Sequence, residues 1–301
     1  MKNKSLTIFL IILLSIIVVL CSIFYIAILT NKNFSKYFHL SSINFGYEIS
    51  NELVLDKKYD GIFKEIAIDS KASDIEIKES TSEEVKVVIY GDKDKTKVDS
   101  MNDKLTITSD GKSCIGLCFH KKIAKIEIYL PSTYENKIII TNKYGNIKLG
   151  NFSNMNANIQ MNCGDIDIGS IKQATIKNDY GDIIINQYVE ELEATESCGD
   201  VKVNEVNSIN VKNNYGDIKI HKVNKSLAIK DDCGDIEIDS LSIKENSTIK
   251  NDYGDIKIGS TNEIYIDAKT SLGDTKIKNN YQKSDVTLTI ENDCGDIEVN
   301  N

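Results

Sequence analysis

The sequence predicts an all-β fold, a parallel β-solenoid (β-helix) with coils of about 18–19 residues, preceded by one transmembrane α-helix. Three observations lead to this prediction. A Gly-Asp or Gly-Asn pair recurs nine times in the second half, an alternating apolar strand follows each pair, and an uncharged apolar run stands near the N-terminus. The chain accordingly divides into an anchor at 1–31, a juxtamembrane spacer at 32–60 and a repeat domain at 61–301, with regular repeats at 138–300.

The apolar run from Leu6 to Thr30 is 25 residues long, and no charge occurs between Lys4 and Lys32. As a helix it would reach about 37 Å, which exceeds the roughly 30 Å hydrocarbon core of a membrane. A cleavable signal peptide has a shorter apolar region and a small-residue cleavage site. We therefore expect a single-pass signal anchor in the cell membrane. Only a few residues precede the apolar run and a long folded domain follows it, which favours an extracellular repeat domain.

The repeat is defined by its turn glycines, which are 17 to 22 residues apart. They are Gly145, Gly164, Gly181, Gly199, Gly216, Gly234, Gly254, Gly273 and Gly295. At the second and fourth positions after each glycine, only Thr275 among 18 residues is not aliphatic. Mostly charged residues lie between these positions, which is the period of a half-buried strand. Units this short leave no room for a crossover helix, so consecutive strands must wind in one direction and pair in parallel.

The residue before each glycine alternates between Tyr and Cys, except at Leu272. The alternation leaves open whether one coil holds one unit or two, and the strands and turns within each unit favour one. Cysteines would then lie two rungs, or about 9.6 Å, apart, too far for a disulfide. We interpret the cysteines as small apolar core residues, and the tyrosines as corner packing in preference to a carbohydrate platform.

The residue after each glycine suggests a column of carboxylates. These are Asp165, Asp182, Asp200, Asp217, Asp235, Asp255, Asp274 and Asp296, with Asn146 in the first unit. Stacked about 4.8 Å apart, they could bind Ca²⁺ between rungs, but we favour carboxylates that cap their turns. Elsewhere, Cys114 and Cys118 could form a small loop disulfide, and with His120 they make only a weak metal-site pattern.

Composition excludes two classes of function. The 36 basic residues are all Lys and the net charge is −9, so we expect no nucleic-acid partner. An enzyme is not expected, because the histidines His39, His120 and His221 are scattered and the aspartates follow the repeat. We expect no cofactor.

From about residue 60 onward the chain resembles the putative-adhesin β-strand-repeat family of bacteria, a family of unknown function. The resemblance lies in DIEI, EEVKVVIYGD, LTI, KIEIYLP and the following GDI turns. The resemblance implies adhesion. Together with the predicted anchor and the lack of a catalytic pattern, it leads us to expect a non-catalytic, membrane-anchored cell-envelope protein that presents its solenoid to a protein or envelope polymer for adhesion or scaffolding. The alternatives are a regulatory or sensory module of an envelope-stress response, or a Ca²⁺-stabilised rod. We also expect self-association through an open C-terminal strand edge, which Asp296 and Glu298 partly guard.

Overall fold

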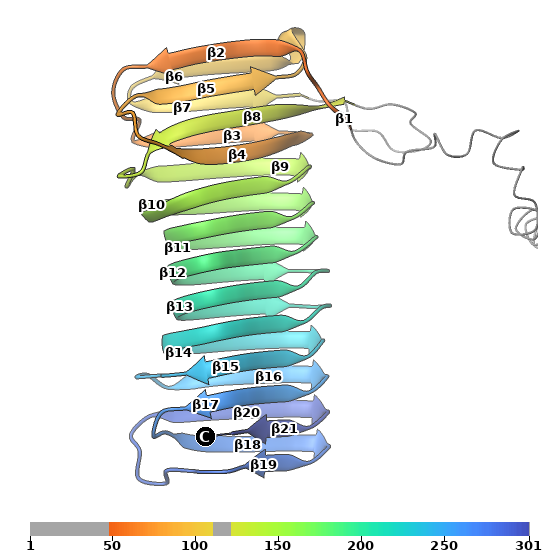
Figure 1. Ribbon diagram of the computed structural model, residues 1–301. Coiled ribbons are helices and arrows are strands. Elements are labelled where there is room, and N and C mark those ends of the chain that lie inside the picture. Colours follow the sequence, from red (N-terminus) through yellow and green to blue (C-terminus); the bar gives the residue numbers. More distant parts are fainter. Residues whose placement is uncertain (1–47, 111–121, 301) are drawn as a thin grey trace, which may run out of the picture. The chain divides into compact units, whose positions relative to one another are not determined.

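The computed structural model describes residues 48–110 and 122–300, which belong to one compact unit (Figure 1). Within these residues it contains 21 strands and a single 3₁₀ turn, η2 (Lys93–Lys95). The N-terminal strands are β1 (Glu48–Ile49), β2 (Leu53–Tyr59), β3 (Glu65–Ser70), β4 (Ser73–Ser80), β5 (Val85–Tyr90), β6 (Thr96–Met101), β7 (Lys104–Ser109) and β8 (Lys122–Pro131). The repeat strands are β9 (Lys137–Tyr144), β10 (Ile147–Cys163), β11 (Ile166–Tyr180), β12 (Ile183–Glu196), β13 (Val201–Asn213), β14 (Ile218–Cys233), β15 (Ile236–Leu241), β16 (Ser247–Tyr253), β17 (Ile256–Thr261), β18 (Tyr265–Leu272), β19 (Thr275–Ile277), β20 (Thr287–Cys294) and β21 (Ile297–Val299).

The predicted parallel β-solenoid is confirmed, with one Gly-Asp unit in each coil. Ile147 pairs with Ile166, Ile166 with Ile183, and Ile183 with Val201, always in parallel. Each coil runs outward from its glycine corner, bends, and returns to the next corner. The bend follows Phe152 in β10, where the register with β11 shifts.

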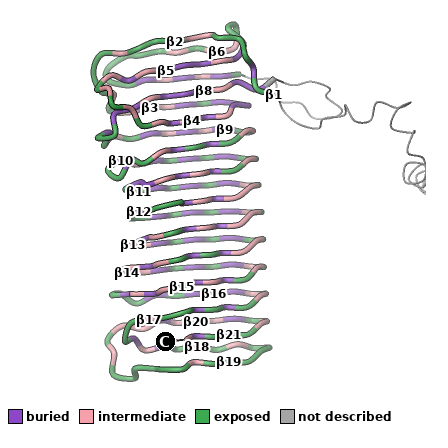
Figure 2. Tube along the Cα trace, viewed as in Figure 1, coloured by how far each residue is buried: buried purple, intermediate pink, exposed green. Residues whose placement is uncertain are grey.

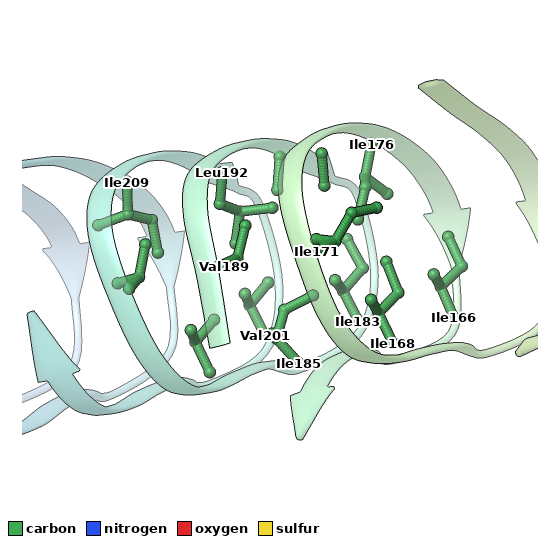
Figure 3. Close-up of a cluster of buried hydrophobic side chains, with 14 of the residues drawn as sticks. Ile166, Ile168, Ile171, Ile176, Ile183, Ile185, Val189, Leu192, Val201 and Ile209 are labelled. Atoms are coloured by element: carbon green, nitrogen blue, oxygen red, sulfur yellow. The ribbon is translucent and has the colours of Figure 1, made fainter. Parts of the chain in front are cut away.

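The two halves of each coil face each other across the core. Ile166, Ile168 and Ile171 from the outward half of β11 meet Ile176 from its returning half (Figure 3). All four side chains are at most 2% exposed. Buried and exposed residues alternate along the strands, as the period of two requires (Figure 2). Burial of this Ile- and Val-rich stack is the main stabilising contribution, and each coil obtains it from its neighbours.

The spatial order of the last three rungs differs from their sequence order. Strands β20 and β21, which come last in the sequence, lie between β16/β17 and β18/β19, with every pairing parallel (Figure 1). The rung of Gly273 is therefore the terminal one, although Gly295 follows it in the chain. Ion pairs support this order, because Glu291 lies between Lys250 and Lys269 at 2.8 and 2.9 Å.

The spatial order of the rungs also differs from their sequence order at the N-terminal end. Strands β3 and β4 come before β7 and β8 in the chain but lie between them and β9/β10. Glu65 thereby pairs with both Lys104 and Lys137, and it makes a 2.6 Å ion pair with Lys104. Strands β2, β5 and β6 add antiparallel pairs beyond this point, so the unit ends in a short antiparallel cap.

Strands are already present before the predicted boundary at residue 61. Part of the expected spacer, Leu53–Tyr59, forms β2 and pairs with β5. Val54, Leu55 and Tyr59 are partly buried against the core, and this apolar contact is the reason for the difference. The expected membrane-spanning segment at 6–30 lies outside the described residues. In the part that the structure describes, no helix is long and apolar enough to cross a membrane.

The expected open edge at the end of the chain is also corrected. Because β21 pairs with both β17 and β19, Asp296 and Glu298 lie inside the stack. The exposed edge belongs to β18 and β19 instead. The side chain of Asn280 covers part of it, because it accepts a hydrogen bond from Ile266 N at 2.9 Å and donates one to Ile266 O at 2.8 Å.

Candidate interaction surface at the glycine corner

The residues that precede the turn glycines form an exposed column, which we call the corner column. In spatial order it consists of Tyr144, Cys163, Tyr180, Cys198, Tyr215, Cys233, Tyr253, Cys294 and Leu272. The rung exchange at the C-terminal end places Cys294 next to Tyr253. The alternation that is interrupted in the sequence at Leu272 is therefore continuous in space up to the terminal rung.

The corner column is exposed, which overturns the expectation of buried cysteines and packed tyrosines. Tyr180, Tyr215 and Tyr253 are 60–62% exposed. Cys163, Cys198 and Cys233 are exposed free thiols, and Cys294 is half-buried. The reason is the tight turn: the residue before each glycine points outward, while the residue three before it points into the coil.

The turn requires glycine because the coils approach closely at this corner. A Cβ atom at Gly181, whose φ is +122°, would overlap with the carbonyl oxygen of Gly164. Gly199 is not in the left-handed region, yet a Cβ there would overlap with Gly181 O in the same way. Close stacking is therefore the shared reason for these glycines, and positive φ is an additional one at Gly181.

The residues after the glycines form a hydrogen-bonded carboxylate ladder. Each Oδ1 atom, except that of the terminal Asp274, accepts a hydrogen bond from the backbone N–H of its counterpart on the next rung. For example, Asp182 N donates to Asp165 Oδ1 at 3.0 Å, and Asp217 N donates to Asp200 Oδ1 at 2.9 Å. Asn146 Oδ1 accepts from Asp165 N at 3.0 Å, which explains why Asn is compatible with this position. The aspartates thus connect neighbouring coils, where the sequence had suggested that each caps its own turn.

This ladder leaves the second carboxylate oxygens for other partners. Lys202 pairs with Asp182 and Asp200 at 3.3 and 3.0 Å. Partial burial acts to raise the pKa of Asp200, but the hydrogen bond from Asp217 N and the Lys202 ammonium group outweigh it and lower this pKa. Across residues 48–110 and 122–300, no group of three or more His, Cys, Asp or Glu side chains is arranged to hold a metal ion.

Behind the corner lies a column of mostly polar and mostly buried residues, which we call the inner ladder, formed by the residues three positions before each glycine. In spatial order it is Asn142, Met161, Asn178, Glu196, Asn213, Asp231, Asn251, Asn292 and Thr270. Four of its five asparagines donate to glycine carbonyls at the corner, as in Asn213 Nδ2 to Gly216 O at 2.8 Å, and Asn142 donates to Ser73 O. These bonds fix the turn from the inside.

Glu196 and Asp231 are the two carboxyl groups of the inner ladder, and both are fully buried. Burial raises the pKa of each to about 7. Glu196 Oε1 accepts backbone N–H groups from Ser197 and Cys198 at 3.1 Å. Neither Glu196 Oε2 nor the Oδ1 atom of the neighbouring Asn213 has a hydrogen-bond partner among the described residues. A protonated carboxyl group would supply the missing donor.

The other predicted site residues do not gather into a site. Cys114, Cys118 and His120 lie outside the described residues, as does His39. His221 makes a 2.8 Å contact with Asp239, but both side chains are more than half exposed on a sheet face. Sequence reasoning did not single out Glu196 and Asp231. The available signal was that both stand three residues before a glycine, at the position held by Asn in the tyrosine units.

The fold and this surface define a repeat protein whose distinctive side chains lie along one corner of a stack. The chain belongs to the Toastrack DUF4097 family, whose model matches it twice, at 63–188 and 183–301. The two matches meet in β12, so each covers one half of the solenoid together with one end at which rungs are exchanged.

Solved structures with similar chains include two putative adhesins, from Bacteroides fragilis and Parabacteroides merdae. Their identities are 14% and 15%, with TM-scores of 0.39 and 0.37. A putative lipid binding protein from Parabacteroides distasonis has 12% identity and a TM-score of 0.38. Each match covers 84% of this chain and 98–99% of the other. Among curated protein sequences, none matches this chain.

Proposed function

We propose that this protein is a non-catalytic adhesion or scaffolding protein of the cell envelope, which presents the corner column to a partner. The observation that carries the proposal is the exposure of Tyr180, Tyr215 and Tyr253 on successive alternate coils. Large aromatic side chains are preferred anchors at interfaces, because they bury much surface at a small cost in conformational entropy. An evenly spaced row of them favours an extended partner that contacts several coils at once.

A non-catalytic role agrees with the family and with the chemistry of the corner. The carboxylates that recur along it are engaged in bonds between coils, as between Asp235 and Asp255. Their role in the ladder is the same in coil after coil, whereas a catalytic centre needs different groups with different roles at one place.

Membrane attachment through residues 6–30, with the solenoid outside the cell, forms the second part of the proposal. Its support is the uncharged apolar run of the sequence, which is long enough to cross a bilayer. Deletion of 6–30 should release the protein from the membrane fraction. In intact cells, a membrane-impermeant maleimide should label Cys163, Cys198 and Cys233. Labelling only after lysis would contradict the extracellular placement.

Adhesion itself is tested with beads that carry the full-length protein, mixed with envelope fragments from the source cell. We expect the beads to retain envelope material, and the Tyr180→Ala/Tyr215→Ala/Tyr253→Ala variant to retain much less. The Tyr281→Ala variant removes an exposed ring away from the column and should behave as the parent does. Equal retention by all three proteins, or by none, would refute the proposal.

A further inference from the structure

The corner column has a spacing and a charge pattern that together indicate a ligand class. The alternate tyrosines are two rungs apart, which is about 9.6 Å at the usual strand spacing. Between them, each cysteine rung carries a much smaller side chain. A partner that contacts every tyrosine must therefore be extended, and must present the same face at every second unit.

Carboxylates border this column on both sides. On one side lies the carboxylate ladder, with Asp182 and Asp255 beside two of the tyrosines. On the other side, the residues two positions before the glycines include Asp179, Asp232 and Asp252, which are half-buried. From Asn162 to Asp296, these two flanks contain no lysine.

Lysines on the adjoining faces neutralise part of this charge. Lys202 pairs with Asp182 and Asp200, and Lys230 pairs with Asp232 at 2.6 Å. Asp179 and Asp252 have no such ion pair among the described residues, and they stand next to Tyr180 and Tyr253. The corner thus remains a negatively charged strip with aromatic rings along its middle.

We infer that the corner column binds a linear β-1,4-linked glycan whose sugars carry free 2-amino groups, an inference that rests on the proposed adhesive function. In such a chain, one pyranose ring advances the polymer by about the height of one rung. Successive rings are turned over, so the same apolar ring face recurs at every second sugar, in step with the tyrosines. The amino groups project alternately to the two sides of the chain, where the two carboxylate flanks lie.

The physical chemistry of the contact follows from these positions. A Tyr ring offers an apolar face to the C–H bonds of a sugar and an electron-rich face to a neighbouring ammonium group. The flanking aspartates add charge-assisted hydrogen bonds to the protonated amines. The same negative charge disfavours acidic glycans and nucleic acids, and it opposes the docking of a second copy through the same corner.

The test uses the full-length protein and four probes at a pH where the amines are protonated. The probes are the glucosamine hexamer, its fully N-acetylated form, cellohexaose and hexalysine. The chain has 14 tyrosines and no tryptophan, so its intrinsic fluorescence reports on tyrosine directly. We expect the glucosamine hexamer to bind with a change in this fluorescence, confirmed by calorimetry, and to bind at least about tenfold more tightly than the other three.

Three variants test whether binding occurs at the column. Tyr215→Ala should weaken binding of the glucosamine hexamer about tenfold, whereas Tyr281→Ala, an exposed ring in the loop after β19, should leave it unchanged. Asp179→Asn/Asp252→Asn should reduce the preference for the amino form over the N-acetylated form. Unaltered melting curves show that each variant is folded.

Three results would overturn the inference: equal binding of hexalysine, equal binding of the N-acetylated hexamer, or no binding of the glucosamine hexamer. The bead assay distinguishes failure of the glycan inference from failure of the proposed adhesive function. If beads still retain envelope fragments through the three tyrosines while the glucosamine hexamer does not compete, the surface is adhesive and its ligand is of another class. If neither probe nor envelope binds, both proposals fail.

Discussion

Glu291 forms an ion pair with Lys250 at 2.8 Å, so the last coil of the sequence rests directly on the coil of Gly254. Strands β18 and β19 lie between these two residues in the chain but beyond them in space. The interposed Glu291 separates Lys250 from Lys269, which would face each other if the rungs followed the order of the sequence. Facing like charges are destabilising, and the exchanged order replaces them with two ion pairs.

The exchanged order should depend on the charge of residue 291. Glu291→Lys places three lysines on consecutive rungs, and we expect a lower melting temperature that partly recovers at high salt. Glu263→Lys changes the charge by the same amount at an exposed position and is the control. Thermal melting at two salt concentrations checks this. Equal losses in both variants would show that the charge pattern does not select the order.

The buried carboxyls should make stability depend on pH. A carboxyl group whose pKa is about 7 in the folded chain and about 4 in the unfolded chain takes up a proton on folding. Stability should therefore fall as the pH rises from about 4 to about 7, and should stay lower above that range. Glu196→Gln and Asp231→Asn should flatten the profile and stabilise the protein above pH 7, on the order of 1–3 kcal/mol each. Unfolding by urea between pH 5 and pH 8 measures this, and a wild-type profile that rises across the range would contradict it.

Close stacking at the corner should make Gly199 sensitive to substitution. Gly199→Ala introduces a Cβ atom that overlaps with the backbone of the preceding coil at Gly181. We expect the free energy of unfolding to fall by more than about 3 kcal/mol. In Gly150→Ala, the nearest atoms belong to the flexible Glu79 side chain, so the loss should be below about 1 kcal/mol. Urea unfolding compares the two variants. Similar losses would show that close approach does not explain the glycine.

The carboxylate ladder predicts a difference between two substitutions of one residue. Asp235→Ala removes the acceptor of a 2.8 Å hydrogen bond from Asp255 N and should cost about 1 kcal/mol. Asp235→Asn retains an oxygen acceptor, as Asn146 does, and should be nearly neutral. The free energies of unfolding provide the measurement. An equal cost for both would point to the negative charge of Asp235 as the important property.

The exposed thiols should react in the native state. Peptide mapping after brief maleimide treatment of the folded protein should find Cys163, Cys198 and Cys233 modified first, with Cys294 slower. Protection of these cysteines until the protein unfolds would restore the interpretation of them as core residues.

Several parts of this structure could be read from local pattern. The alternation after each glycine located Ile166, Ile183 and Val201 in the core, and the DIEI segment at Asp74–Ile77 carried part of the family resemblance. In the structure, Ile75 pairs with Ile147, and Asp74 Oδ1 accepts a hydrogen bond from Asn146 N at 2.8 Å. These predictions succeeded because a period of two with one buried face permits only one register.

The exposure of the corner column could not be read in this way. Tyr180 and Cys198 stand next to glycines, where the strand period is interrupted, so alternation does not determine which way their side chains point. The outward direction depends on the backbone conformation of the turn. The burial of Glu196 and Asp231 could not be predicted for a related reason, because it depends on the conformation of the same turn.

By itself, the sequence determined the class of fold and the aliphatic core residues, and it favoured one Gly-Asp unit in each coil, because these depend on spacing along a single strand. Only the tertiary structure decided which coil rests on which. Every Gly-Asp unit has a similar apolar face, so hydrophobic burial hardly distinguishes one stacking order from another. The stacking order depends on contacts between coils, such as those of Glu291 with Lys250 and Lys269, and of Cys294 with Tyr253. Those contacts exist only once the coils are stacked.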